Sequence, residues 1–423
     1  MYKIGQLWVL RNLVKIEKER KVFMLGKVIN TYKYQNLNNS QNKQNVSFKG
    51  GFNYKTLEIK GKETSAKIFT NNIEYKACNQ IKEICNHPIF RDLPIRIMPD
   101  VHPSKNTVVG FSAPVGDVGV IPAIIGSDIG CGMLCLNFDT QGQEIDYEKL
   151  DNVIKDFLSY DRTHTPQSLK KVPKDLTKNL NDICQELYKT SGDYQVSRLA
   201  SIGSGNHFIE IDKDSNGKHY LVVHTGSRGL GKKFAEHHQF IARHQNHYFI
   251  KELSYLSGDE AKKYLEDMRV IQKYAEVNRR CVADEILYRM GWKEIDSFES
   301  IHNYISSDGI IRKGAIEAKK EQPLLIPLNM RDGAILAKGK GNIDWNNTAP
   351  HGAGRKIPRG EASKLITLDE FQASMSGIHS KSIKERTIDE APFAYKDSNE
   401  IIANIEDTAE IKEIIKPIFN YKE

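Results

Sequence analysis

The sequence predicts an α+β fold, with one large domain in which strands and helices are mixed. Several short apolar runs end in glycine-rich turns, and one long segment has helical periodicity. The 423 residues are 39% hydrophobic and 27% charged, which is enough to bury a sizeable core. A plain dinucleotide-binding unit is not expected, because GSRGLG at 226–231 lacks the required glycine spacing.

The composition changes near residue 56, which predicts an extension over residues 1–55 and a globular domain over residues 56–423. The first 50 residues hold ten Lys and Arg against two acidic residues. YQNLNNSQNKQN at 34–45 is a polar low-complexity tract that cannot bury a core, so we expect the extension to be poorly ordered. It could be a basic tail that binds nucleic acid, or upstream sequence included through a wrong start codon.

Four segments are typical of strands that end in polar or glycine-rich turns. PIRIMPDVHP at 94–103 alternates apolar and polar residues before a polar turn. VGVIPAIIGSDIGCGM at 118–133 is an apolar run that breaks into glycines. HYLVVHTGSRGLG at 219–231 and QPLLIPLNMRDG at 322–333 repeat that pattern. The ends of strands are common places for functional sites.

The segment near 257–291 is predicted to be a helix whose role is packing. Ser257 and Glu260 fit a capping box at its start. Apolar residues then follow at helical spacing, namely Leu265, Met268, Ile271 and Ala275.

Composition excludes some classes of protein. No apolar run is long enough for a membrane span, and the charged N-terminal residues do not fit a secretory signal. The six cysteines show no tight framework spacing, so we expect a reduced, cytoplasmic protein. The formal net charge of +7 permits a nucleic-acid partner but does not require one.

Four phrases carry side chains of the kinds that bind metal ions. The phrases are GSDIGCGM, GSGNHFIE, VVHTGSRG and IHNYISSDG, and their candidate ligands are Asp128, Cys131, Asn206, His207, Glu210, His224 and His302. Carboxylate, thiolate and imidazole groups hold Mn, Zn, Fe or Co in proteins. Each residue has an ordinary alternative, since a histidine after a strand can simply form hydrogen bonds and Cys131 can be a small buried apolar residue.

The remaining histidines give weaker signals. A group on a predicted helix is expected to face solvent, namely His237, His238, His244 and His247. His87, His164 and His379 stand without other candidate ligands nearby in the sequence.

His351 stands in TAPHGAGRKIPRG at 348–360, a turn rich in Gly, Ala and Pro, with Arg355 four residues later. Glycines let a backbone approach a ligand closely. His351 could cap the turn, bind a metal ion or act as a nucleophile, and the phrase alone does not choose among these roles.

Taken together, these phrases resemble the RtcB family of RNA ligases. The matching phrases are MPDVHP, GSDIGCGM, GSGNHFIE, VVHTGSRGLG, HNY, RKGA, HGAGR and DEAPFAYK, and they run in the family's order from about residue 57 to the C-terminus. The resemblance implies an RtcB-type catalytic domain over 56–423, with strands that end in glycine turns at a central metal site. GSDIGCG, GNHF and HGAGR are highly specific in combination.

The resemblance also implies roles for single residues. It implies that His351 becomes covalently guanylylated, and that two Mn²⁺ ions are bound by Asp128, Cys131, His207, His224 and His302. For GTP it implies a set of contact residues: Asn206, Ala353, Gly354, Tyr395 and Lys422. Within that set Asn206 would touch the phosphate, and Tyr395 and Lys422 the guanine. Arg355 is a candidate phosphate clamp, because its planar fork suits bidentate contact.

The implied activity joins an RNA end bearing a 3′-phosphate or 2′,3′-cyclic phosphate to a 5′-hydroxyl end, in RNA repair or tRNA splicing. GTP would supply GMP to His351, the GMP would move to the RNA 3′-phosphate, and the 5′-hydroxyl would then expel it. We expect a cytoplasmic monomer. Basic residues near the site phrases could guide RNA phosphates, namely Arg228, Arg312, Lys313, Arg355, Lys356 and Arg359.

Two departures from the family pattern leave other functions open. Ser204 stands where the family has a glycine before GNHF, and PLNMRDG at 327–333 replaces a Gly-Ser-Met-Gly turn. One alternative is a metal-dependent phosphodiesterase on the same scaffold, which would not need His351. The other is a catalytically inactive protein that binds RNA ends, which would form no covalent adduct with GTP.

Overall fold

The structure is a computed structural model and describes residues 46–47, 56–105, 107–159 and 161–423. The chain divides into two units, residues 1–46 and 47–423. The predicted extension over residues 1–55 lies outside the described residues, apart from the two-residue strand β1 (Val46–Ser47). All other described elements belong to the second unit.

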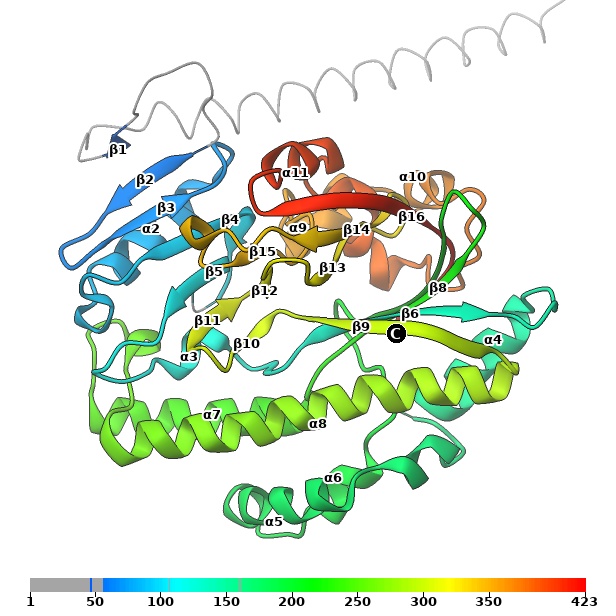
Figure 1. Ribbon diagram of the computed structural model, residues 1–423, viewed down its shortest axis with the longest axis horizontal. Coiled ribbons are helices and arrows are strands. Elements are labelled where there is room, and N and C mark those ends of the chain that lie inside the picture. The colour runs from blue at the N-terminus through cyan, green and yellow to red at the C-terminus, as the bar shows by residue number, and fades with distance from the viewer. Residues whose placement is uncertain (1–45, 48–55, 106, 160) are drawn as a thin grey trace, which may run out of the picture. The chain divides into compact units, whose positions relative to one another are not determined.

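The second unit combines two large sheets with helices, which confirms the predicted α+β fold (Figure 1). In the first sheet, strands lie in the order β2-β3-β4-β5-β11-β10. Their bounds are β2 (Leu57–Lys60), β3 (Ser65–Ile68), β4 (Ile95–Pro103), β5 (Val108–Pro114), β11 (Ile310–Lys313) and β10 (Asn303–Ile305). Among these strands only β3 and β4 pair in parallel.

The second sheet has the order β13-β14-β16-β7-β8-β6-β9, and its neighbouring strands all run antiparallel. The bounds are β13 (Pro323–Asn329), β14 (Gly333–Gly339), β16 (Ala409–Tyr421), β7 (Phe208–Lys213), β8 (His219–Thr225), β6 (Gly132–Asp139) and β9 (Lys293–Ile301). A separate pair joins β12 (Ala315–Glu317) to β15 (Thr348–Pro350).

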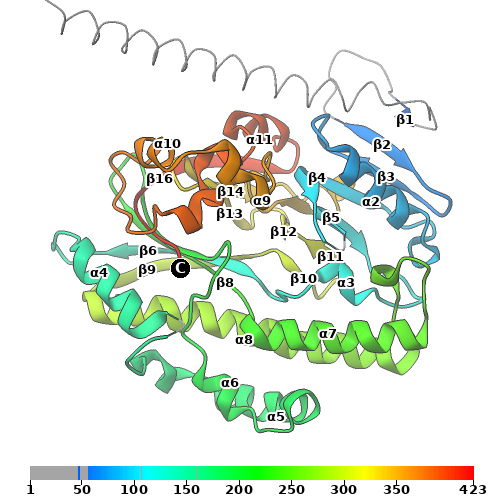
Figure 2. The same cartoon turned by 180° about the vertical axis from the view of Figure 1, so that it is seen from behind.

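Figures 1 and 2 show α7 beside one half of the long helix α8, while the other half of α8 runs beneath β6 and β9, and α9, α10 and α11 lie near β14 and β16. The helices are α2 (Tyr75–Cys85), α3 (Pro122–Ile125), α4 (Tyr147–Val153), α5 (Lys174–Tyr188), α6 (Asp193–Ser197), α7 (Arg228–Gln245), α8 (Gly258–Met290), α9 (Arg359–Leu365), α10 (Leu368–Ser374) and α11 (Ser398–Asn404). Within the described part of the chain, none of them has the length and apolar character needed to cross a membrane.

The predicted helix near 257–291 is α8, which spans 33 residues and ends where Gly291 adopts a left-handed conformation with φ of 74°. Glycine commonly ends helices in this way, because it has no Cβ to clash. The predicted capping box is wrong. Ser257 does occupy the N-cap, but its hydroxyl accepts a hydrogen bond from Asn246 Nδ2 at 3.0 Å, and it makes no bond to the first turn of α8.

The apolar run at 118–133 does not form one strand. Pro122–Ile125 form the short helix α3, with Pro122 in its first turn, and β6 begins only at Gly132. Proline is favoured in a first turn because the N–H that it lacks would have no helical partner there. The other three segments predicted as strands contain β4, β8 and β13.

Two adjacent residues of α8, Asn278 and Arg279, are fully buried and bind the turns above the helix. Asn278 Nδ2 donates to the carbonyl of Ser201 at 2.9 Å, and its Oδ1 accepts from the Ser201 N–H at 3.0 Å. Arg279 Nη1 donates to the carbonyls of Gly130 and Thr225 at 2.6 and 3.0 Å. Because these turns adjoin candidate metal ligands, α8 fixes where those ligands lie.

Replacing Arg279 with methionine should lower the free energy of unfolding by about 3–5 kcal/mol, because Glu299 and two buried carbonyls would lose their cationic partner. Arg280→Met is the matched control. The Arg280 side chain is 41% exposed where it pairs with Glu294 and Asp284, so its loss should cost about 1 kcal/mol or less. Denaturant titration compares the two variants, and equal losses would contradict the anchoring role of Arg279.

Candidate functional site

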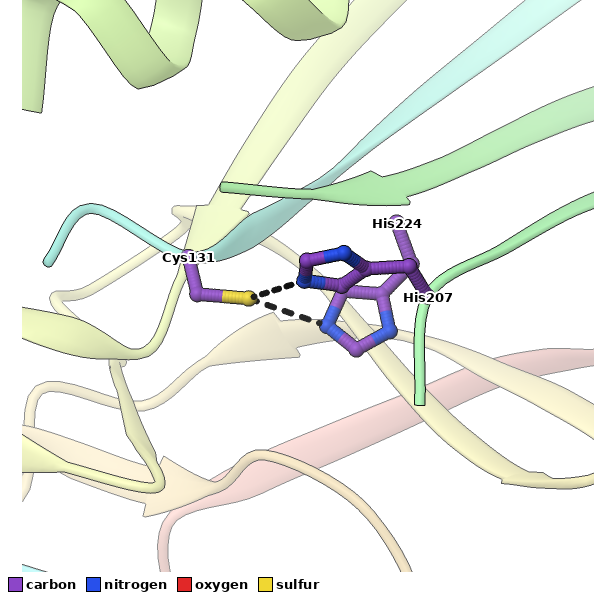
Figure 3. Close-up of side chains that lie close together, drawn as sticks. All are labelled: Cys131, His207 and His224. Atoms are coloured by element: carbon purple, nitrogen blue, oxygen red, sulfur yellow. Dashed lines mark hydrogen bonds between the residues drawn. The ribbon is translucent and has the colours of Figure 1, made fainter. Parts of the chain in front are cut away.

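Three of the predicted metal ligands, Cys131, His207 and His224, converge on one point (Figure 3). The Sγ of Cys131 lies 3.4 Å from His207 Nε2 and 3.3 Å from His224 Nε2. All three side chains are buried. The strand register explains this meeting, since Cys131 immediately precedes β6, His207 immediately precedes β7, and His224 on β8 pairs with residues of both strands.

Asp128 and His302, the other two predicted ligands, lie at the same point. Asp128 Oδ2 is 2.9 Å from His207 Nε2, and His302 Nε2 is 3.4 Å from His224 Nε2. Gly226 makes room for Asp128, because a Cβ at position 226 would lie 2.2 Å from Asp128 Oδ1. The structure therefore brings all five predicted ligands together.

Burial controls the protonation of these groups, because it disfavours the charged form. It lowers the pKa of His224 and of His302 well below the usual histidine value, and nearby histidines and cations lower both further. It raises the pKa of the Cys131 thiol, and the charge of Asp128 raises that pKa further. Burial would also raise the pKa of Asp128, but interactions with His207, Cys131 and Arg228 hold it well below its usual range. Asp128 is thus an anion, while the Cys131 thiol and the His224 and His302 rings are uncharged.

The donor set suits a divalent metal ion. The three ligand atoms of the group in Figure 3 lie within 4.8 Å of one another. Two of the rings are also held from behind: His224 Nδ1 donates to the carbonyl of Asn206 at 3.1 Å, and His207 Nδ1 lies 3.0 Å from Arg228 Nη1. Outer contacts of this kind commonly orient metal-binding histidines. A cation that took the place of the proton between His207 and Asp128 would be held by both, so these residues fit a bound metal.

His351 lies beside this cluster and is held by Asp100, a residue that the sequence pattern did not mark. His351 Nδ1 lies 2.6 Å from Asp100 Oδ2, and its backbone N–H donates to the same oxygen at 3.1 Å. Its ring centroid is 4.9 Å from that of His302. Because an ionised carboxylate only accepts hydrogen bonds, the proton sits on Nδ1 and Nε2 keeps a free electron pair. The phrase MPDVHP, which contains Asp100, is the part of the sequence that could have marked this residue.

The turn that follows His351 packs directly on β4. Gly354 has φ of 71°, which disfavours other residues, and a Cβ there would lie 2.3 Å from the carbonyl oxygen of Asp100. The backbone N–H of Lys396 donates to the Gly354 carbonyl at 3.0 Å, and its Nζ donates to the Pro99 carbonyl at 3.0 Å. Lys396 therefore ties the turn to β4 and keeps Asp100 opposite His351.

An open cavity lies beside His351. The predicted nucleotide-contact residues all line it: Asn206, Ala353, Gly354, Arg355, Tyr395 and Lys422. His224 and His351 form part of the same wall, so the cavity adjoins the predicted metal-binding cluster of Asp128, Cys131, His207, His224 and His302. Glu210, a candidate metal ligand, also faces this cavity, and Asn420 Nδ2 donates to it at 2.6 Å.

Glu390 organises the polar side of the cavity. Its carboxylate binds Lys422 Nζ at 2.5 Å, accepts the Tyr395 hydroxyl at 2.5 Å and pairs with Arg355 and Arg359. Burial would raise the pKa of Glu390, but Lys422, Arg359 and Arg355 hold it well below its usual range. The sequence pattern did not mark Glu390 either, although it stands in DEAPFAYK.

One of the basic residues predicted to guide RNA phosphates faces inward. Arg312 is fully buried and donates to Thr348 Oγ1 at 3.0 Å and to the carbonyl of Asn346 at 3.2 Å. The prediction that it contacts RNA is therefore wrong, because β11 lies between β5 and β10 inside the first sheet. Lys356 and Arg359 are exposed, as an RNA-contacting role requires.

Two histidines differ from their predicted surroundings. His238 is predicted to face solvent, yet it is buried against Phe234 and Tyr264. His87 is also buried, and its Nε2 donates to the carbonyl of Leu253 at 3.0 Å. Both rings fill the core, which explains why neither belongs to the metal-binding cluster.

His379 has acidic neighbours that its sequence position did not indicate. Its Nε2 lies 2.9 Å from Asp151 Oδ2, and Glu148 completes a second group of possible ligands. However, Lys381 Nζ lies 3.3 Å from Asp151 Oδ2 and 2.5 Å from Glu148 Oε2. This ammonium group already pairs with both carboxylates, so we read the group as an ion-pair network that joins α4 to the segment before α11.

Known proteins are similar in sequence to most of this chain. The model of the family described as tRNA-splicing ligase RtcB matches residues 80–194 and 184–423. The chain is similar to the RNA-splicing ligase RtcB of Escherichia coli strain K12, with 25% identity over 401 aligned positions that cover 85% of this chain and 97% of the relative. It is also similar to the tRNA-splicing ligase RtcB of Nanoarchaeum equitans, with 26% identity over 402 positions that cover 72% of this chain and 83% of the relative.

Replacing Cys131 with alanine should weaken the binding of a divalent ion such as Mn²⁺ by about 100-fold or more. Losing a residue that only contacts a metal ligand typically lowers metal affinity by about 10–100-fold, and losing a ligand itself should cost at least as much. Cys135→Ala is the matched control, since Cys135 is also buried, lies on β6 and is not one of the grouped ligands in the described chain. Equilibrium dialysis with elemental analysis measures the bound ion. Equal affinity in both variants would mean that Cys131 does not hold it.

Proposed function

The chain belongs to the RtcB family, and we propose that it is an RNA ligase that joins RNA 3′-phosphate or 2′,3′-cyclic phosphate ends to 5′-hydroxyl ends. The observation that carries this proposal is the position of His351, which bonds Asp100 through Nδ1 beside both the cavity and the metal-binding cluster. An imidazole with a free nitrogen is a competent nucleophile toward phosphorus. The names of the relatives, RNA-splicing and tRNA-splicing ligase, support RNA as the substrate.

GTP is the nucleotide that we assign to the cavity. Tyr395 and Lys422 would meet the guanine, while Asn206 and Arg355 would meet the phosphates. The backbone of the glycine turn at 352–354 can approach the nucleotide closely, because little side chain covers it. Glu390 would keep the cationic side chains in place while the nucleotide enters and leaves.

The metal-binding cluster would hold Mn²⁺ through Asp128, Cys131, His207, His224 and His302. When bound, the divalent ions supply positive charge that stabilises phosphate oxygens as negative charge builds up on them.

His351 carries the covalent chemistry in this proposal. Its Nε2 attacks the α-phosphorus of GTP, an N–P bond forms, and the bond to the bridging oxygen breaks, which releases pyrophosphate. An oxygen of the RNA 3′-phosphate then takes the GMP from His351 and restores the free Nε2. The 5′-hydroxyl oxygen attacks the activated RNA phosphorus, loses its proton and expels GMP. A 2′,3′-cyclic phosphate must first be opened by water to a 3′-phosphate.

Asp100 supports the first step in two ways. By accepting from Nδ1–H, it selects the tautomer in which Nε2 is the nucleophile. When the N–P bond forms, the ring becomes positively charged, and the carboxylate stabilises that charge. The second bond, from the backbone N–H of His351, fixes the direction of the ring relative to β4.

Incubation with α-³²P-GTP and Mn²⁺ should label the denatured wild-type chain, and His351→Ala should abolish the label because the N–P bond forms at that ring. His237→Ala is the control, since His237 pairs with Glu186 on the helical side of the unit. The labelled chain should then ligate 3′-phosphate and 5′-hydroxyl RNA ends. If the wild type binds metal but takes no label, the ligase mechanism fails and a phosphodiesterase or an RNA-end-binding protein becomes the better explanation.

Asp100→Asn should slow the labelling of His351 by about 100- to 10,000-fold, because the amide can present a donor to Nδ1 and leave the proton on Nε2. Single-turnover labelling at saturating GTP measures this rate. Asp117→Asn, at an exposed carboxylate, is the control and should label at the wild-type rate. An unchanged rate in Asp100→Asn would rule out the assigned role of Asp100 in selecting the tautomer.

A further inference from the structure

Phe393 and Arg331 form an exposed pair beside the cavity. The side chain of Phe393 is 40% exposed, although its neighbours in the chain, Pro392 and Ala394, are buried. The guanidinium carbon of Arg331 lies 5.9 Å from the centre of the Phe393 ring, within the range of a cation–π contact. A single exposed phenylalanine needs no explanation, so the case for a function depends on what surrounds this one.

Both members of the pair belong to segments that line the cavity. Arg331 directly follows Met330, which is part of the cavity wall. Phe393 stands between Glu390 and Tyr395, two further residues of that wall. Because Phe393 and Arg331 are exposed while their neighbours face the cavity, the pair lies at the cavity rim.

The two segments pack against each other, which fixes the pair in place. Met330 is buried in one apolar cluster with Ala391 and Ala394, the residues around the turn that carries Phe393. The carbonyl of Ala394 also accepts from the backbone N–H of Lys356 at 2.9 Å. A side chain on such a rigid turn loses little conformational freedom when it contacts a ligand.

Asp332 fixes the direction of the Arg331 side chain. Its Oδ1 accepts from Arg331 Nε at 2.8 Å, and its Oδ2 accepts from Arg331 Nη2 at 3.3 Å. The same Oδ2 accepts from Asn329 Nδ2 and Ser398 Oγ, both at 2.8 Å. Partial burial would raise the pKa of Asp332, but these three donors lower it to about 2, so the carboxylate is ionised at neutral pH.

Lys416 adds a positive charge beside the pair. It is exposed, and its Nζ donates to the backbone carbonyl of Asp332 at 2.9 Å. Because the Asp332 carboxylate balances the charge of Arg331, Lys416 leaves the group with a net positive charge. An aromatic ring and a guanidinium plane stack on the unpaired bases of single-stranded RNA, and cations pair with its phosphates.

We propose that Phe393 and Arg331 form a platform on which one base of single-stranded RNA stacks, close to the 3′-phosphate of that strand, while Lys416 contacts a neighbouring phosphate. This inference rests on the proposed function, because the 3′-phosphate must reach His351 in the cavity to receive GMP, and the adjoining nucleotides then cross the rim. The position at the entrance to the proposed active site favours RNA over a protein partner. Stacking would tolerate any base, since every base has a π-face.

Binding of a short single-stranded RNA with a 3′-phosphate, followed by fluorescence anisotropy without GTP, tests the platform. Phe393→Ala should weaken this binding by about 10-fold, because one stacked base is lost, while Phe393→Trp should stay within about 3-fold of the wild type. Phe249→Ala is the matched control, since Phe249 is also exposed but lies between α7 and α8 and does not line the cavity. Unchanged affinity in Phe393→Ala would overturn the proposal and favour a protein contact at this pair.

Abasic RNA separates stacking from a general effect on the fold. RNAs that lack one base at a time, counted from the 3′-phosphate, locate the base that occupies the platform. Removing that base should cost the wild type about 10-fold in affinity and should cost Phe393→Ala almost nothing, because the ring that it would contact is already absent. If every abasic RNA weakens both proteins equally, the ring touches no base and the proposal fails.

Salt dependence separates stacking from charge. Lys416→Gln should lower the slope of log Kd against log salt concentration by about 0.7, because one phosphate contact is lost. Phe393→Ala should keep the slope of the wild type, since the ring carries no charge. An unchanged slope in Lys416→Gln would overturn the phosphate contact assigned to Lys416.

Labelling of His351 separates this proposal from the proposed function. Labelling with GTP needs no RNA, so Phe393→Ala should label at the wild-type rate, while the transfer of GMP to subsaturating RNA should be about 10-fold slower. If the wild type takes no label but binds RNA through Phe393, the ligase function fails and the platform stands. If labelling is normal and RNA binding does not depend on Phe393, only the platform fails. A defect confined to the attack of the 5′-hydroxyl strand would also overturn the assignment to the 3′-phosphate strand.

Discussion

The antiparallel register of β6, β7 and β8 is the constraint on which the rest of the structure depends. Cys131 and His207 stand one residue before β6 and β7, and His224 faces both of those strands from β8. A shift of one residue in either pairing would turn His224 to the opposite face of the sheet. Arg279 and Asn278 on α8 add to this constraint, because they hold the turns at which the strands begin or end. The backbone register therefore places the buried imidazoles and the thiol close together.

The proposed nucleophile stands where elements of both large sheets meet. Asp100 comes from β4 of the first sheet, while the cluster beside His351 comes from the second. Lys396 joins the turn after His351 to β4 of the first sheet through one backbone bond and one side-chain bond. Two buried carboxylates support the groups around the cavity: Asp100 pairs with His351, and Glu390 pairs with Lys422, Arg355 and Arg359. Each carboxylate holds its partners in a fixed position.

Much of the site could be predicted from the sequence, because the chemistry lies in compact phrases. The five predicted metal ligands lie close together, and the predicted nucleotide-contact residues line one cavity. The helix near 257–291 and three of the four strand segments were predictable from periodicity. By contrast, the apolar run at 118–133 forms α3, since apolar content alone does not separate a buried helix from a strand.

The supporting residues could not be predicted, because their roles depend on contacts between distant segments. Asp100 and His351 are separated by 251 positions, and no local sequence pattern near either residue predicts their contact. The sequence predicted Arg312 to be an exposed cation. The strand order places β11 between β5 and β10, and the Arg312 side chain is buried. The roles of such residues can be identified only once the folded structure shows their contacts.

The position of β16 has a consequence for the order in which the chain can fold. This strand is the last described element in sequence, yet it lies inside the second sheet, between β14 and β7. Until it inserts, β13 and β14 form one partial sheet and β7, β8, β6 and β9 form another, each with an open edge. The cavity wall includes residues of β13, β7 and the end of β16, so it cannot exist in either partial sheet. The complete cavity wall therefore forms only once β16 has inserted, and long-range contacts of this kind form slowly compared with local helices.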